Sequence, residues 1–130
     1  MDLILELKKE TDNKIRWDKV IDNTPFELYI PKWRVPSPKP REIEIEVLPH
    51  NNSVINNPLT ITQVKNNPNL KNSSIAANLT IFGDHSRTVR YDPEGNENMW
   101  EIGSVYIPIS ILNQKGLYGK ERICIKIKWR

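Results

Sequence analysis

Apolar and polar residues alternate along three segments of this chain, at residues 3–8, 42–47 and 123–129. A period of two predicts β-strands with one buried and one solvent-exposed face. Most of the apolar positions are Ile, Leu or Val, and β-branched residues favour strand over helix. On this register four isoleucines are predicted to be buried and the cysteine to face outward: Ile43, Ile45, Ile123 and Ile125, and Cys124.

Few segments suit a helix, because ten prolines are spread along the 130 residues and proline interrupts helical hydrogen bonding. The best helical candidate is a single turn at residues 108–112. Residues 59–64, between two Asn-Asn-Pro sequences, are predicted to form one extra strand. The surrounding residues 49–73 contain eight Asn and are predicted to be either a surface connection or a recognition loop.

The same short β unit occurs twice. Its three segments match in order and chemistry: position 14 aligns with 88, 28 with 105 and 43 with 123. The spacing between the copies thus grows along the unit, as expected for a shared core with loops of different length. The match aligns Trp17 with Tyr91 and Tyr29 with Tyr106, so these aromatic residues are predicted to be core or interface anchors. The segments are residues 14–18, 28–31 and 41–47 in the first copy and 88–92, 105–108 and 122–127 in the second.

A unit of about 50 residues buries too little surface to be stable alone. We therefore expect a single domain, residues 1–130, of two pseudo-repeats. The first copy covers about 1–48, an Asn-rich connection covers 49–73, and the second copy covers 74–130. The predicted fold class is all-β: an internally duplicated small sandwich or barrel with a shared core and at most one short helical turn.

Composition excludes several classes of function. A formal net charge of +3 is too small to indicate nucleic-acid binding by itself, and one cysteine excludes internal disulfides and a multi-cysteine zinc site. The tripeptide Asp84-His85-Ser86 cannot form a triad, because adjacent strand residues point to opposite faces. We predict no enzymatic activity, no metal and no cofactor. The first residues resemble neither a signal peptide nor a membrane span, so we expect a cytoplasmic protein with no membrane partner.

Tryptophans beside basic residues indicate a partner surface, since this composition is typical of binding hot spots. The alternatives are that the indoles cover an open barrel end or stack on single-stranded nucleic acid. The candidate interaction surface comprises Lys32, Trp33, Arg34, Trp100, Lys126, Lys128, Trp129 and Arg130.

The equivalent third strands of the two copies carry opposite charges on their outward faces. The first strand has Glu42, Glu44 and Glu46, and the second has Lys126 and Lys128. Three explanations are open. The strands pair within one chain, they mediate self-association between an acidic and a basic edge, or the difference reflects drift.

Residues 103–112 followed by residues 122–127 resemble the swapped-hairpin transition-state regulators and antitoxins. In that family a strand ending in Ile-Pro precedes a short helical turn and then a strand of alternating aliphatic residues, and the resemblance implies a DNA-binding role. The whole repeat unit is also similar to short uncharacterised β-rich proteins of bacteria and their phages, which implies no particular activity.

These observations leave two classes of function. The first is a non-enzymatic binding module with a protein partner. It rests on the missing catalytic constellations and the tryptophans. The alternative is a DNA-binding or antitoxin-like protein, in which the tandem copies mimic a homodimer.

Overall fold

The computed structural model describes residues 3–54 and 58–130. Its strands are β1 (Leu3–Glu10), β2 (Lys14–Ile21), β3 (Thr24–Pro31), β4 (Glu42–Pro49), β5 (Ile75–Asp84), β6 (Thr88–Pro93), β7 (Val105–Pro108) and β8 (Arg122–Trp129). Its helices are α1 (Ile61–Asn66) and α2 (Ile109–Lys115), with 3₁₀ turns η1 (Lys32–Arg34), η2 (Pro68–Asn72) and η3 (Glu97–Met99).

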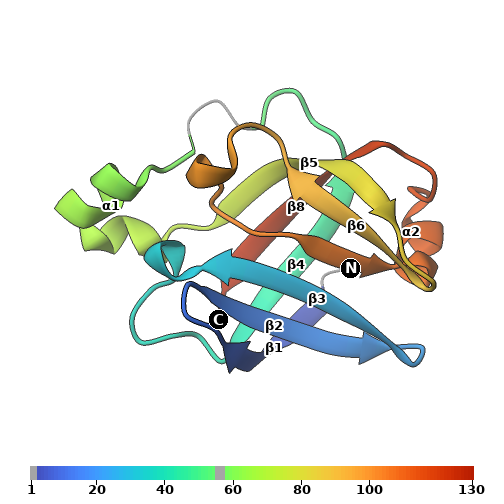
Figure 1. Ribbon diagram of the computed structural model, residues 1–130, viewed down its shortest axis with the longest axis horizontal. Coiled ribbons are helices and arrows are strands. Elements are labelled where there is room, and N and C mark those ends of the chain that lie inside the picture. The colour runs from blue at the N-terminus through green and yellow to red at the C-terminus, as the bar shows by residue number, and fades with distance from the viewer. Residues whose placement is uncertain (1–2, 55–57) are drawn as a thin grey trace.

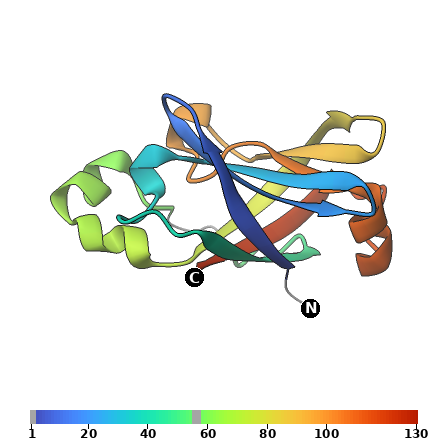
Figure 2. The same ribbon diagram turned by 90° about the horizontal axis from the view of Figure 1, so that it is seen from below.

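The strands close into one antiparallel barrel in the order β1-β2-β3-β7-β6-β5-β8-β4 (Figure 1). The inward side chains form a single core to which both halves of the chain contribute. The helices α1 and α2 lie at opposite ends of the barrel (Figures 1 and 2), and α2 buries Ile111 and Leu112 against the core. The predicted all-β fold with a shared core is confirmed, and so is the burial of the four isoleucines, Ile43, Ile45, Ile123 and Ile125.

The two halves of the barrel use the same strand ladders. The β1–β2 pair and the β5–β6 pair each contain a bulge, and the two bulges fall between Leu7 and Lys9 and between Ile81 and Gly83. These positions are equivalent, because the alignment that matches 14 with 88 also matches 7 with 81 and 9 with 83. The hairpins that follow also share a register: Trp17 lies opposite Leu28, and Tyr91 lies opposite Val105.

A buried aromatic residue occupies the same ladder position in each half. The Trp17 indole N–H donates a 3.0 Å hydrogen bond to the carbonyl of Pro40, just before β4. The Tyr91 hydroxyl donates a 2.7 Å hydrogen bond to the carbonyl of Lys120, just before β8. Both rings are fully buried, so each fills the core while its polar atom is satisfied at the start of the equivalent strand.

The prediction that Cys124 faces outward is correct, but the exposure to solvent that it implies is wrong. Its neighbours Ile123 and Ile125 belong to the core, which places Cys124 on the outer face of β8, yet its side chain is fully buried. The adjacent Asn78 exchanges two hydrogen bonds with the backbone of Asn51, at 2.8 and 3.2 Å. The segment after β4 therefore lies over this part of the outer face and covers the thiol.

The prediction of an extra strand at residues 59–64 is also wrong, because helix α1 begins within it. The Thr60 hydroxyl accepts from the backbone N–H of Gln63, and the Gln63 side chain accepts from the backbone N–H of Thr60. This capping box satisfies two donors that a helix start leaves unpaired. The helical turn predicted at residues 108–112 corresponds to the start of α2. Part of the predicted connection, residues 55–57, lies outside the described residues.

Candidate interaction surface

The two histidines make isolated contacts. His50 lies 4.0 Å from Glu94, which already accepts two hydrogen bonds from Arg122. His85 packs against the ring of Tyr106, with centroids 5.5 Å apart. Across residues 3–54 and 58–130, no group of three or more His, Cys, Asp or Glu side chains could hold a metal ion. Neither contact is the base–nucleophile pair that acyl transfer requires.

Two tryptophans from different halves of the chain line a single groove. Trp33 lies in η1 after β3, and Trp100 directly follows η3. Together with Pro31 they border a groove of about 190 Å³. Trp100 also borders a second groove of about 250 Å³, beside Met99, which is 54 % exposed. We call this pair of depressions the tryptophan grooves.

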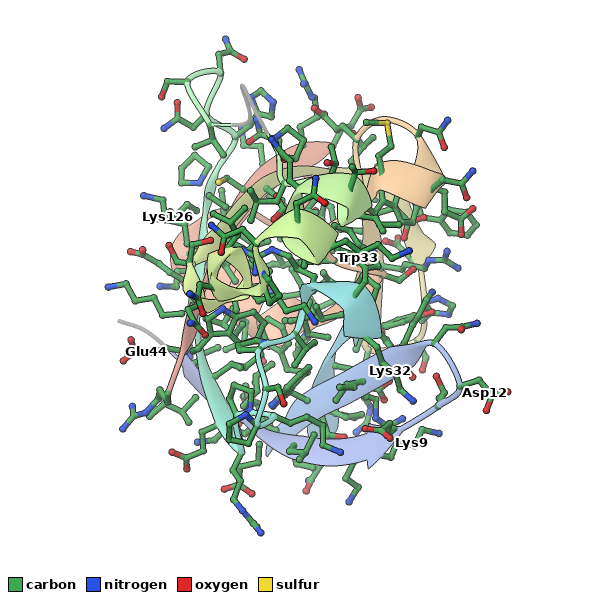
Figure 3. The ribbon with its side chains drawn as sticks, turned by 90° about the vertical axis from the view of Figure 1, so that its left-hand side faces the viewer. Lys9, Asp12, Lys32, Trp33, Glu44 and Lys126 are labelled. Carbon is green, nitrogen blue, oxygen red and sulfur yellow. The ribbon has the colours of Figure 1, made fainter. Side chains whose placement is uncertain are left out.

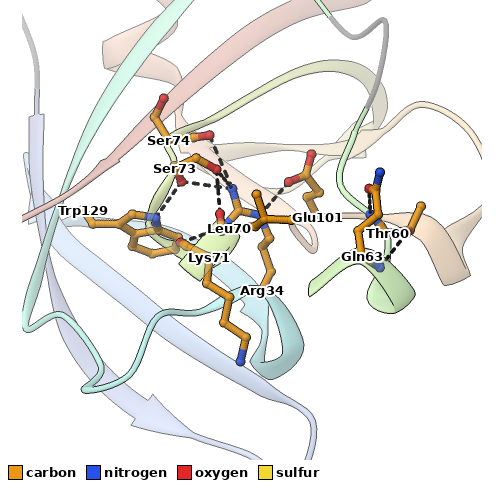
Figure 4. A network of polar contacts seen from close by, with 9 residues as sticks. All are labelled: Arg34, Thr60, Gln63, Leu70, Lys71, Ser73, Ser74, Glu101 and Trp129. Carbon is orange, nitrogen blue, oxygen red and sulfur yellow. Dashed lines mark hydrogen bonds and ion pairs between the residues drawn. The ribbon is translucent and has the colours of Figure 1, made fainter. Parts of the chain in front are cut away.

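Arg34 was predicted to belong to the interaction surface, and this is wrong because its side chain is fully buried. Its Nε donates a 2.6 Å hydrogen bond to the Glu101 carboxylate (Figure 4). Its two terminal nitrogens donate to the backbone carbonyls of Lys71, Ser73 and Ser74, at 2.9 to 3.4 Å. A buried charge of this kind needs a counter-ion and hydrogen-bond acceptors, and Arg34 has Glu101 and an acceptor for each of its three nitrogens. It therefore fixes the end of the connection against the barrel.

Trp129 and Lys32 are also engaged within the molecule. The Trp129 indole N–H donates a 2.9 Å hydrogen bond to the carbonyl of Ser73, and its ring lies 6.1 Å from that of Trp17. Lys32 forms an ion pair with Glu10 at 3.4 Å. Trp129 thus belongs to the packing between β8 and the connection, whereas Lys32 remains half-buried beside Trp33.

The remaining basic residues of the candidate surface lie on β8 or directly after it, beside the acidic residues of β4. Lys128 pairs with Glu44 in the ladder, and Lys126 pairs with Glu46. Arg130 places nitrogens 3.6 Å from the carboxylates of Glu42 and Glu44. Of the three explanations for the opposite charges, pairing within one chain is the arrangement found here. Figure 3 shows Glu44 and Lys126 at one side of the barrel, away from Trp33, so the candidate residues form separate patches.

Arginine networks on the outer face of the barrel were not predicted from the sequence. Arg16 donates to the Tyr29 hydroxyl at 3.4 Å and lies 3.4 Å from Asp18. Arg90, at the equivalent position of the second half, donates two 3.1 Å hydrogen bonds to Asp92. The Tyr29 hydroxyl raises the pKa of Arg16, and the Asp92 carboxylate raises that of Arg90, so both guanidinium groups remain charged. The repeated outward Arg in the two copies was the available signal.

These networks meet where β3 pairs with β7. Tyr29 and Tyr106 pack edge to face, with ring centroids 6.4 Å apart. Beside them, the Arg90 guanidinium lies 3.8 Å from the ring centroid of Phe82, which is 65 % exposed. The two aligned aromatic pairs thus differ in position. Trp17 and Tyr91 are buried in the core, whereas Tyr29 and Tyr106 lie on the outer face of the barrel.

Comparisons of the chain with protein-family models, with curated proteins and with solved structures found no match. In the described residues, no helix has the length and apolar character needed to cross a membrane.

Proposed function

We propose that this protein is a non-enzymatic binding module that engages a protein partner through the tryptophan grooves. The observation that carries the proposal is the position of Trp33 and Trp100, which come from different halves of the chain yet border one groove. Large aromatic rings at the centre of a shallow depression are typical anchors of protein interfaces. The Trp100 N–H donates to the Gly95 carbonyl at 3.2 Å, which holds the ring in place before binding and lowers the ordering cost.

A protein partner is favoured over DNA by the distribution of charge. The lysines that give the second half its basic character, Lys126 and Lys128, face Glu46 and Glu44. Binding to a phosphate backbone depends on cationic side chains that can replace counter-ions, and these lysines are offset by adjacent carboxylates. The charges therefore give little support to DNA binding, whereas the tryptophan grooves support a protein partner.

The test is affinity capture from the source cells with the wild type, Trp33→Ala and Trp100→Ala, followed by calorimetric titration of the purified partner. Val20→Ala is the matched control, because Val20 is an exposed apolar residue at the far end of β2. We expect each tryptophan variant to raise Kd by roughly 10- to 100-fold, which is the effect of losing one hot-spot side chain. The control should leave Kd unchanged.

A partner bound equally by all four proteins would contradict the assignment. Titration of labelled duplex and single-stranded DNA at two salt concentrations tests the alternative. Binding that weakens steeply with salt and ignores both tryptophans would identify a DNA-binding protein instead.

A further inference from the structure

The two halves of the barrel meet at two seams, β3 with β7 and β4 with β8, and each seam pairs equivalent strands of the two copies. In the β4–β8 seam, Glu46 lies opposite Lys126, and the alignment that matches 43 with 123 also matches 46 with 126. On either side of this pair, Ile45 lies opposite Ile127 and Val47 lies opposite Ile125. The same alignment matches 45 with 125 and 47 with 127, so exchanging the two halves turns each of these pairs into the other. This ladder therefore maps onto itself when the two halves are exchanged.

The second seam has the same property. Leu28 of β3 lies opposite Val105 of β7, and these two positions are equivalent in the alignment of the copies. Burial alone does not require this, because a slip of two residues keeps the same face inward. Two seams that are both centred on equivalent residues define a two-fold axis between the halves. This is the geometry of an isologous dimer interface, here joined into one chain.

A two-fold axis places the residue at the centre of a seam opposite its own counterpart, so a true homodimer of the first half would bring Glu46 against Glu46. In this chain the outward residues of the seam are instead sorted by charge, with acids on β4 and bases on β8. Glu44 lies opposite Lys128, and Glu46 opposite Lys126. Opposite charges directly across a strand pair stabilise it, and like charges destabilise it. Pairing of either half with a second copy of itself is therefore disfavoured.

We propose that the β4–β8 seam is a self-recognition surface. Its acids on β4 and bases on β8 make the first half of the barrel pair with a second half rather than with another first half. That second half is normally supplied by the same chain. When the charges within a chain are mismatched, a second copy of this chain with complementary charges is the partner that fits. The seam is separate from the tryptophan grooves, so this inference stands independently of the proposed function.

The experiment uses full-length charge variants. The acidic-side variant carries Glu44→Lys and Glu46→Lys, and the basic-side variant carries Lys126→Glu and Lys128→Glu. Each has a seam of like charge, and we expect its Tm to fall by on the order of 5 °C at low salt. The variant with all four changes restores opposite charges and is expected to recover most of the loss. Lys19→Glu with Lys120→Glu is the matched control for the basic-side variant, because it makes the same change in net charge at exposed lysines away from the seam.

The decisive arm mixes the two double variants in denaturant and refolds them together. If two chains exchange halves through the residues that join β4 to β5, every β4 gains an oppositely charged β8. We expect a 1:1 dimer by light scattering, with a higher Tm than either variant alone and a dependence on salt. Refolding of the mixture into two separate monomers would overturn the proposal. A variant with all four changes that is no more stable than the double variants would overturn it as well.

Discussion

Replacing Arg34 by Ala tests whether one buried cation holds the connection against the barrel. Arg34 is fully buried and donates to Glu101 and to three backbone carbonyls. The substitution leaves the Glu101 carboxylate, whose side chain is only 11 % exposed, without a counter-ion. Removing one partner of a buried ion pair costs about 3–5 kcal/mol, mainly because the other charge stays desolvated.

The lower end of this range is expected here. Two of the carbonyls belong to Ser73 and Ser74, which are exposed, so water can replace part of what Arg34 supplied. A loss of about 3 kcal/mol is roughly a fifth to three fifths of the stability of a typical domain. For a chain of this size it corresponds to a fall in Tm of roughly 10 °C.

The assay is urea unfolding of the wild type, Arg34→Ala, Glu101→Gln and the double variant. We expect the unfolding midpoint to fall and the slope with urea to stay constant, because the native barrel is retained. The double variant should lose less than the sum of the two single losses, since each single change already breaks the pair. Arg87→Ala, at an exposed arginine, is the control and should change stability by less than about 0.5 kcal/mol. If Arg34→Ala were as mild as this control, the buried network would have no stabilising role.

Three further predictions concern the core, the thiol and acid stability. Ile125→Ala should cost about 2–5 kcal/mol in urea unfolding, whereas Lys126→Ala should cost little; an unchanged midpoint for Ile125→Ala would contradict the strand register. Burial raises the pKa of the Cys124 thiol, so alkylation should be much slower in native protein than in urea, and equal rates would mean that the thiol is not covered. Hydrogen bonds from Arg122 hold the pKa of Glu94 below its ordinary value of 4.5. Ionised Glu94 therefore stabilises the fold fully above pH 4.5, and this stabilisation is lost as the pH falls through the lowered pKa. Glu94→Gln should therefore lower Tm at neutral pH, and the difference from the wild type should shrink as the pH falls below 4.5; a constant difference in Tm would contradict this.

Alternation in the sequence predicted β1, β4, β8 and the buried isoleucines because a half-buried strand imposes that pattern directly. It failed at Cys124 because its outer face is covered by a segment tied to Asn78, and periodicity carries no information about such coverage. The failure at residues 59–64 had a local signal: Thr60 and Gln63 have the spacing of a capping box, which outweighs the β propensity of the intervening residues.

The candidate surface was harder to predict than the fold. Proximity of Trp33 and Trp100 depends on how η1 and η3 approach each other across the two halves, which neither segment encodes alone. Arg34 was misplaced because a charged residue beside a tryptophan is usually exposed. Extending the alignment that matches 28 with 105 places position 34 against the buried Ile111. Comparison of the two copies would therefore have indicated a buried position.

The difference between Arg34 and Ile111 marks a place where the two halves of the barrel are not equivalent. The residues just before β5 present backbone carbonyls that need donors. Arg34 supplies those donors to Lys71, Ser73 and Ser74, whereas Ile111 packs into the core. On the proposed duplication, the two copies should diverge at the seams and at the connection. They should stay alike where each half repeats the same internal bond, as in the hydrogen bonds that Trp17 and Tyr91 donate at the start of β4 and β8.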